Sequence, residues 1–169
     1  RETCPYLDPT YLDFLQGYRY DPTEVKITQD GINVSVEVEG NWYRTILWEV
    51  PLLALISEVY YTLTDAQRLS NDEVVKNTSN KIDLYNKLGV TVAEFGTRRR
   101  HSYEVHDQVV NELTNHSGKS FVGTSNVHFA HKYNVKPIGT HAHEWFMFHA
   151  ARFGYKVANS MSLDRWVKV

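Results

Sequence analysis

Three short apolar segments in the second half of the chain each end in the dipeptide Gly-Thr. They are residues 92–97, 121–124 and 137–140, and each is followed by polar residues and then by apolar residues at the spacing of one helix face. A strand, a loop and a helix repeated in this order are typical of parallel βαβ units. The sequence therefore predicts an α/β fold with parallel strands near residues 92–96, 120–123 and 136–139.

The Gly-Thr turns mark the predicted site, because ligands in parallel sheets and barrels bind at the carboxyl ends of the strands. Gly96, Gly123 and Gly139 should lie on one common edge, beside the polar residues that accompany them: Thr97, Arg98, Arg99, Arg100, Thr124, Ser125, Asn126, Thr140, His141, His143 and Glu144. Positive charge, small hydroxyls and turn amides suit an anionic ligand that carries phosphate or carboxylate.

Each of these features also has a plainer interpretation. A Gly-Thr pair after a strand is common turn chemistry, and only its repetition at equivalent positions favours a site. In the run Arg98–Arg100 successive side chains diverge, so at most one or two of them can face the ligand. Asn126 could serve only as the N-cap of the next helix.

His141 and His143 raise zinc as an alternative, since His-x-His at a strand end can place two ligands on one side. A third ligand is difficult to supply, because the predicted helices turn most of the other histidines away and the chain has no His-Glu-x-x-His motif. A serine hydrolase is disfavoured as well, since no Gly-x-Ser-x-Gly turn is present. We expect no metal site in this segment.

The first half of the chain predicts a different arrangement. Asp8-Pro9 is typical of a helix start. Apolar residues then alternate with polar ones from Val25, between turn residues at Asp30-Gly31 and at 39–41. We expect three antiparallel strands here, the third of them spanning Trp42–Trp48.

Helical spacing predicts the remaining elements. One helix begins at Pro51, and a second spans about 72–88 and stops at Gly89, although the polar residues 77–80 could interrupt it. Helices also follow the three predicted parallel strands: one through Val105 and Leu113 with Gly118 as its stop, one around Phe129 and Tyr133, and one over 146–153 that stops at Gly154.

Composition restricts the class of protein. The 169 residues carry a net charge of −2, which gives no overall attraction to nucleic acid or to a membrane. Cys4 is the only cysteine, so no internal disulfide can form, which fits a reducing, cytoplasmic compartment. There is neither a signal peptide nor an uninterrupted apolar run of about 18 residues. The chain lacks an initiator Met, and three βα units cannot close a barrel, so we expect an internal piece of a longer protein.

The segments "EFGTRRRHS" (94–102), "VGTSNV" (122–127) and "PIGTHAHEWFM" (137–147), in this order and spacing, closely resemble the nicotinate phosphoribosyltransferase family. "YLDFLQGYRYDP" (11–22) and "ILWEVPLLALISE" (46–58) are similar to upstream segments of the same family, so the resemblance spans nearly the whole chain. Related transferases that use nicotinamide or quinolinate share the architecture but differ from the Thr-Arg-Arg-Arg and Ala-His-Glu-Trp sequences found here.

The resemblance implies an enzyme of NAD salvage that joins nicotinate to phosphoribosyl pyrophosphate, releases pyrophosphate and couples turnover to ATP hydrolysis, with Mg²⁺ accompanying the pyrophosphate substrate. It implies an irregular α/β (TIM-like) barrel of the type II phosphoribosyltransferases, preceded by an antiparallel strand and helix region, in a homodimer. Residues 1–50 would belong to the N-terminal α/β domain, 51–90 would form connecting helices, and 91–169 would form the first βα units of the barrel.

The resemblance also assigns roles to single residues. His143 matches the histidine that ATP phosphorylates in this family, with Glu144 in support. The arginines would bind a carboxylate or phosphate, Thr140 would contact the pyridine ring or its carboxylate, and His141 departs from the pattern as a supporting or incidental residue. The family's tyrosine-bearing N-terminal segment and its Asp-Ser-Gly-Asp-Pro loop are outside this chain, so the segment alone should be inactive. A transferase for nicotinamide or another base, and a non-catalytic module that binds phosphorylated ligands, are the alternative functions.

Overall fold

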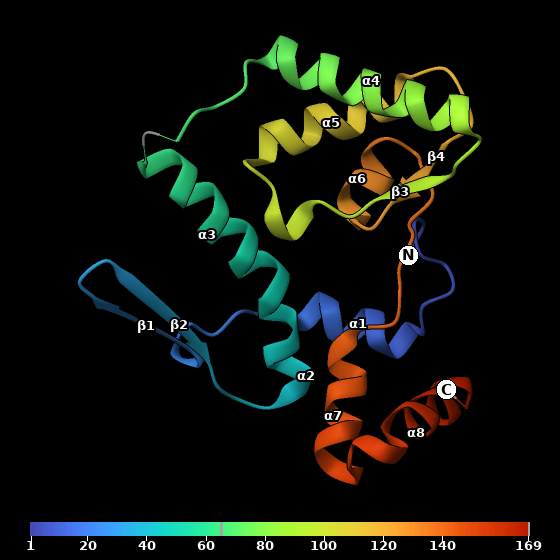
Figure 1. Cartoon of the computed structure of the whole chain (residues 1–169). Helices are drawn as coiled ribbons and strands as arrows, with labels where there is room; N and C mark the ends of the chain where they lie inside the picture. Colours follow the sequence, from blue (N-terminus) through green and yellow to red (C-terminus); the bar gives the residue numbers. More distant parts are fainter. Residues whose placement is uncertain (65, 169) are drawn as a thin grey trace. The chain divides into compact units, whose positions relative to one another are not determined.

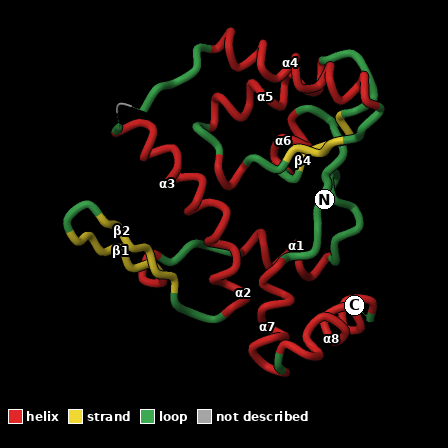
Figure 2. Tube along the Cα trace, in the orientation of Figure 1, coloured by secondary structure: helices red, strands yellow, loops and turns green. Residues whose placement is uncertain are grey.

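The computed structural model describes residues 1–64 and 66–168, and the chain divides into two compact units, Arg1–Ile138 and Gly139–Val169. Figure 1 shows the order of the elements, and Figure 2 separates helices from strands. Helices dominate both units, and the described strands form two small sheets in the first unit, β1-β2 and β3-β4. The fold is therefore mixed α/β, whereas a barrel and the domain boundaries at residues 50 and 90 stay predictions.

The N-terminal elements follow their local signals. Helix α1 (Pro9–Gly17) begins where the Asp8 carboxylate accepts hydrogen bonds from the amides of Thr10 and Tyr11. After a short 3-10 turn, η1 (Pro22–Glu24), strands β1 (Val25–Asp30) and β2 (Asn33–Val38) pair antiparallel. Gly31, in the turn between them, has a φ of 59° that favours glycine, so the predicted hairpin is confirmed.

The predicted third strand is wrong. Trp42–Thr45 is helix α2 and Ile46–Trp48 is a 3-10 turn, η2, which leads directly into α3 (Glu49–Leu63). Aromatic and branched residues favour a strand locally, but the turns bring Arg44 and Trp48 onto one acceptor. The Trp48 indole donates to Glu24 Oε2 at 2.8 Å, and Arg44 forms an ion pair with the same carboxylate. Long-range pairing of this kind overrides strand propensity.

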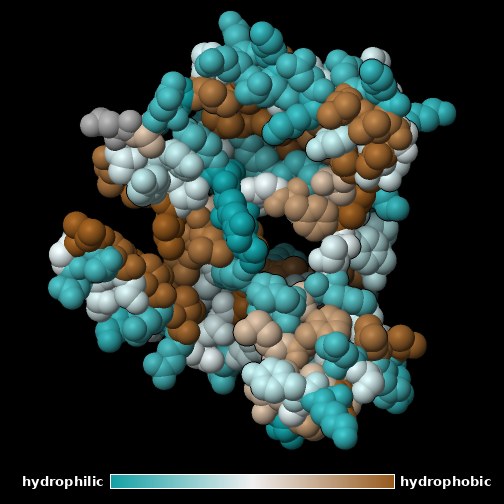
Figure 3. All heavy atoms as spheres, in the orientation of Figure 1, coloured by the Kyte–Doolittle hydropathy of each residue, from teal (hydrophilic) through white to brown (hydrophobic). Residues whose placement is uncertain are grey.

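The continuous helical stretch Trp42–Leu63 has 22 residues and a mean hydropathy of 1.4, enough to cross a membrane by length and composition alone. A single helix of this kind is weak evidence for a membrane span. Figure 3 shows apolar surface along α3, and its exposed apolar side chains include Leu53, Ile56 and Leu63. Two carboxylates on the same helix, Glu49 and Glu58, are paired with arginines of the same unit.

Helix α4 (Asn71–Leu88) has the predicted ends. Ser70 and Glu73 form a reciprocal capping box, and Gly89 ends the helix at a φ of 65°. The polar stretch 77–80 does not interrupt it, and the hydroxyls of Thr78 and Ser79 find acceptors in carbonyls one turn earlier, at 2.8 and 3.0 Å. Helix α5 (Tyr103–Asn115) lies alongside α4 (Figures 1 and 2).

The second sheet carries the predicted parallel strands in shortened form. Strands β3 (Val92–Glu94) and β4 (Phe121–Thr124) pair parallel, with Glu94 opposite Thr124. The third segment contributes only a parallel bridge between Thr124 and Pro137. The pairing consists of two hydrogen bonds, from Thr124 N to the carbonyl of Lys136 and from Ile138 N to the carbonyl of Thr124. The nitrogen of Pro137 faces away from β4, so proline is tolerated there, and the chain passes into the second unit directly after Ile138, where the ladder ends.

The core of the first unit lies where α5 and α6 (Val127–Lys132) cover this sheet. Val110, Phe129 and Thr124 are fully buried there. The second unit is a pair of helices, α7 (His143–Phe153) and α8 (Tyr155–Val167), joined at Gly154 with a φ of 85°. The Trp145 indole of α7 donates to the carbonyl of Ser162 in α8 at 3.0 Å.

Candidate functional site

A buried carboxylate lies at the carboxyl end of the parallel strands. Thr124 Oγ1 donates to Glu94 Oε2 at 2.6 Å, and Nε2 of His106, from α5, lies 2.9 Å from Glu94 Oε1. Burial raises the pKa of Glu94, but the contact with His106 and the hydrogen bond from Thr124 outweigh it, so the pKa lies below its usual value. Glu94 is therefore ionised at neutral pH although its side chain is only 8% exposed.

The loops that follow β3 and β4 are tied to each other beside this carboxylate. The amide of Gly96 donates to Glu94 Oε1, and the amide of Ser125 donates to the carbonyl of Glu94 at 2.8 Å. Asn126 Nδ2 donates to Thr97 Oγ1 at 3.0 Å, which joins the two loops directly. The structure thus brings Gly96-Thr97, which follows β3, and Gly123-Thr124, the last two residues of β4, to one edge. Gly139 begins the second unit, and its place on that edge stays a prediction.

Two predicted substrate contacts have their side chains engaged within the protein. Thr124 is fully buried, and its hydroxyl both donates to Glu94 and accepts the amide of Asn126 at 3.1 Å. Asn126 is the N-cap of α6, where its Oδ1 accepts from the amide of Phe129 at 3.1 Å. The geometry favours positioning roles for both, and direct substrate contact by either side chain stays a prediction.

The three arginines have three different surroundings. They lie in and after the 3-10 turn η3 (Thr97–Arg99). Arg98 forms an ion pair with Glu49 of α3. Arg100 lies 3.4 Å from Glu58, nine residues further along α3, and places its guanidinium 5.5 Å from the ring centre of Tyr103. Arg99 is exposed. Of the three, Arg99 has the side chain most open to solvent, and the other two already face carboxylates.

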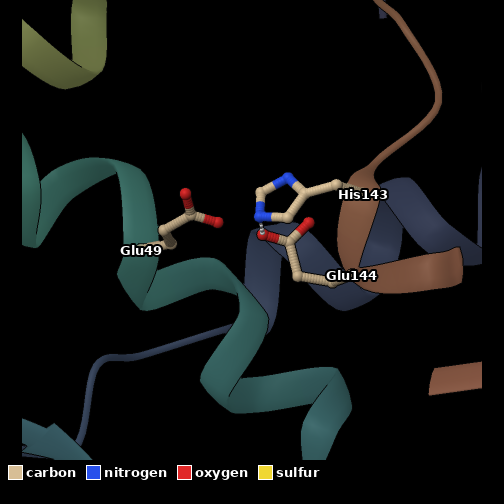
Figure 4. A group of neighbouring side chains, drawn as sticks. All are labelled: Glu49, His143 and Glu144. Carbon is tan, nitrogen blue, oxygen red and sulfur yellow. Dashed lines mark ion pairs between the residues drawn. The ribbon is translucent and has the colours of Figure 1, made fainter. Parts of the chain in front are cut away.

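His143 is the first residue of α7, three positions before the predicted start of that helix. Figure 4 shows its ring beside Glu144, with His143 Nε2 at 2.7 Å from Glu144 Oε1. The imidazole side chain is 63% exposed, so the ring is accessible to a reactant. A helix N-terminus also favours negative charge, because the peptide dipoles of the helix align with their positive end there. His143 therefore combines a fixed, accessible ring with an anion-stabilising position.

The neighbours of His143 are arranged differently. Thr140 is exposed. The ring of His141 packs against Trp166, at 4.7 Å between centres, and against Phe146 at 5.9 Å. The supporting role expected for His141 stays a prediction.

Sequence reasoning missed Glu94 and His106. A carboxylate in an otherwise apolar strand was the available signal for Glu94, since charged residues are rarely buried without a partner. His106 is 12 residues away in the sequence, on the face of α5 that also carries Val110, and its relation to Glu94 follows only from the fold.

Two family models match this chain. The model of the nicotinate phosphoribosyltransferase N-terminal domain matches residues 1–57, and that of the nicotinate phosphoribosyltransferase family matches residues 90–169. The nicotinate phosphoribosyltransferase of Chromohalobacter salexigens is 61% identical over 99% of the chain, and that of Desulforapulum autotrophicum is 43% identical over 98%.

Solved structures agree with these matches. The crystal structure of nicotinate phosphoribosyltransferase from Porphyromonas gingivalis superposes with a TM-score of 0.92 at 43% identity, over 98% of this chain and 43% of that one. The enzyme structure from Vibrio cholerae gives 0.86 at 31% identity, over 99% of this chain and 42% of that one. The chain spans less than half the length of the curated relatives it matches, 43% and 42% for the two named above.

Proposed function

The chain belongs to the nicotinate phosphoribosyltransferase family, and from this membership we propose that the protein makes nicotinate mononucleotide for NAD salvage. The reaction joins nicotinate to phosphoribosyl pyrophosphate and releases pyrophosphate, while ATP is hydrolysed to ADP and phosphate. The observation that carries the proposal is that family models match both ends of the chain, including the segment with His143.

His143 is proposed as the residue that ATP phosphorylates. Its Nε2 faces the Glu144 carboxylate at 2.7 Å, which favours the tautomer with the proton on Nε2 and leaves the lone pair of Nδ1 as the nucleophile. Nδ1 forms a bond to the γ-phosphorus, the bond from that phosphorus to the bridging oxygen breaks, and ADP leaves with the electron pair. The ring proton on Nε2 can then pass to Glu144.

The phosphoryl group on His143 would add charge at the N-terminus of α7. The aligned peptide dipoles of a helix favour negative charge at its N-terminus, so the position lowers the cost of holding phosphate on the ring. The added charge would also alter how neighbouring cationic loops are ordered, which provides a physical route from ATP hydrolysis to substrate binding.

Arg99 is the best candidate among the arginines for the carboxylate of nicotinate. Arg98 and Arg100 face Glu49 and Glu58, whereas Arg99 is exposed and its guanidinium can bind a carboxylate in a bidentate manner. Thr140 is proposed to contact the pyridine ring or its carboxylate. Thr124 and Asn126 are proposed to hold the loops in place for this binding.

The whole protein is proposed to complete an α/β barrel and to act as a cytoplasmic homodimer. Displacement at the anomeric carbon needs the leaving pyrophosphate to be held and the oxocarbenium-like state to be stabilised by charge. Mg²⁺ would arrive on the phosphate oxygens of the substrate, and no residue of this chain is proposed to bind it.

A labelling experiment tests the role of His143. With γ-labelled ATP, the full-length protein should take up phosphate that is stable in alkali and lost in mild acid, as expected for a phosphohistidine. His143→Asn should abolish uptake and uncouple ATP from synthesis while some ATP-independent transfer survives. His141→Asn is the matched control and should label normally. Label on His141, or zinc bound to both histidines, would refute the assignment.

The substrate is tested separately. The full-length protein should use nicotinate in strong preference to nicotinamide, because a cationic side chain at the base pocket favours a ligand with a carboxylate. Equal or greater activity with nicotinamide would assign the protein to a different base. Tight binding of phosphorylated ligands without turnover of either base would indicate a binding module instead.

A further inference from the structure

In the buried network of Glu94, His106 and Thr124, neither Glu94 nor His106 has an assigned role in the proposed chemistry. The side chains of Glu94 and His106 are 8% and 3% exposed, and Thr124 is fully buried, so none of the three presents its side chain to a substrate. The ring of buried Phe129 meets the His106 ring edge-on at 4.7 Å and closes the network on that side. An ionised carboxylate in such a place is costly unless its oxygens are well hydrogen-bonded.

The bonds of Glu94 lead to the two loops at the carboxyl edge of the sheet. Its Oε1 accepts from the amide of Gly96, which begins the turn with the arginines. Its Oε2 accepts from the Thr124 hydroxyl, whose oxygen accepts in turn from the amide of Asn126. The Glu94 carbonyl accepts from the amide of Ser125. Both loops are thus hydrogen-bonded to Glu94, directly or through Thr124.

Gly96 shows how closely this turn is built against the carboxylate. A Cβ at this position would lie 2.7 Å from Glu94 Oε1, so a side chain here would displace either the turn or the carboxylate. The geometry of the turn therefore depends on the place of the Glu94 oxygens, not on φ alone.

We propose that Glu94 is a positioning residue of the active site, which fixes the turn carrying Arg98–Arg100 and the loop carrying Ser125 and Asn126 without touching substrate. The identity of the substrate in this proposal rests on the proposed function, whereas the positioning role of Glu94 rests on the geometry of the network.

Thr124 offers a matched pair of variants in the full-length protein. Thr124→Val keeps the volume of the side chain but removes the hydroxyl, which leaves an oxygen of Glu94 without its donor. Thr124→Ser keeps the hydroxyl. We expect KM for nicotinate to rise about tenfold or more in Thr124→Val, the size typical of a lost bond to a buried charge, and to stay within about threefold in Thr124→Ser.

Amide hydrogen exchange gives a second readout that does not depend on activity. Thr124→Val should speed exchange at Gly96–Arg100 and at Ser125–Asn126, while the amides in the middle of α4 stay protected. Glu94→Gln should act in the same way, because Gly96 and Thr124 donate to different oxygens of Glu94 and glutamine replaces one of these oxygens with an NH2 donor.

Two results would overturn the proposal. One is an unchanged KM, with activity falling only in proportion to the folded fraction, which would make the network purely structural. The other is unchanged exchange in both loops. If the wild-type protein does not use nicotinate, the proposed function fails, and the exchange measurement alone then decides the role of Glu94.

Discussion

Gly123 holds the third segment against the sheet, and replacing it with alanine should disrupt that contact. Its φ of 143° is strained for any residue with a side chain. An added Cβ would lie 3.0 Å from both the carbonyl carbon of Lys136 and Cδ1 of Ile138, and closer still to the Lys136 oxygen. That oxygen accepts the amide of Thr124 at 3.1 Å, so the backbone cannot move away without loss of the bond.

The magnitude follows from these contacts. Backbone strain at such a φ costs about 1–3 kcal/mol. Separation of the strands would also break the bonds between Thr124 N and the Lys136 carbonyl and between Ile138 N and the Thr124 carbonyl, each about 1 kcal/mol. Gly123→Ala should therefore lower the free energy of unfolding by about 3–5 kcal/mol.

Urea denaturation of the full-length protein measures this loss, and Gly31→Ala is the matched control. Gly31 also has a positive φ, of 59°, but an added Cβ there would meet no described atom within 4 Å. Its replacement should cost only the left-handed strain, about 1–2 kcal/mol. Equal losses in the two variants would show that the approach of Lys136 to Gly123 contributes nothing.

Two further predictions concern charged groups. His116, which bridges α4 and α5, should stabilise the fold at low pH, because its contact with Asp83 at 2.9 Å raises its pKa. The loss of stability in His116→Asn should be largest below the ordinary histidine pKa and vanish as the pH rises through the raised pKa. A loss that grows with pH in urea titrations would contradict this prediction. Single alanine variants of Arg98, Arg99 and Arg100 should differ from one another. Arg100→Ala should lose about 1 kcal/mol of stability and Arg99→Ala none, whereas Arg99→Ala should lose the most affinity for nicotinate. Three equally mild variants in denaturation and binding assays would mean that all three arginines are surface residues without a role in the site.

The elements with strong local signals were the ones that sequence predicted well. The Asp8-Pro9 helix start, the Asp30-Gly31 hairpin and the α4 stop at Gly89 each depend on contacts within a few residues. The parallel order of the strands was also predictable, because repeated strand, loop and helix segments admit few arrangements. The failures were Trp42–Trp48, where a helix brings two side chains to Glu24, and residues 136–139, where the ladder ends after Ile138 as the chain enters the second unit.

In the candidate site, too, the features that depend on nearby residues were predictable and those that depend on distant residues were not. Sequence placed the Gly-Thr turns at one edge but not the partners of their side chains, because Arg98 meets Glu49 across 49 positions and Arg100 meets Glu58 across 42. Glu94 was open to inference, since it shares a strand face with Val92, where an apolar residue is expected. A charge on an inward face must find partners or remain costly, so that position alone indicates a buried network, although only the fold identifies His106 and Thr124 as its members. A charged residue at an inward-facing strand position should indicate positioning residues in other sheets whose loops bind anions as well.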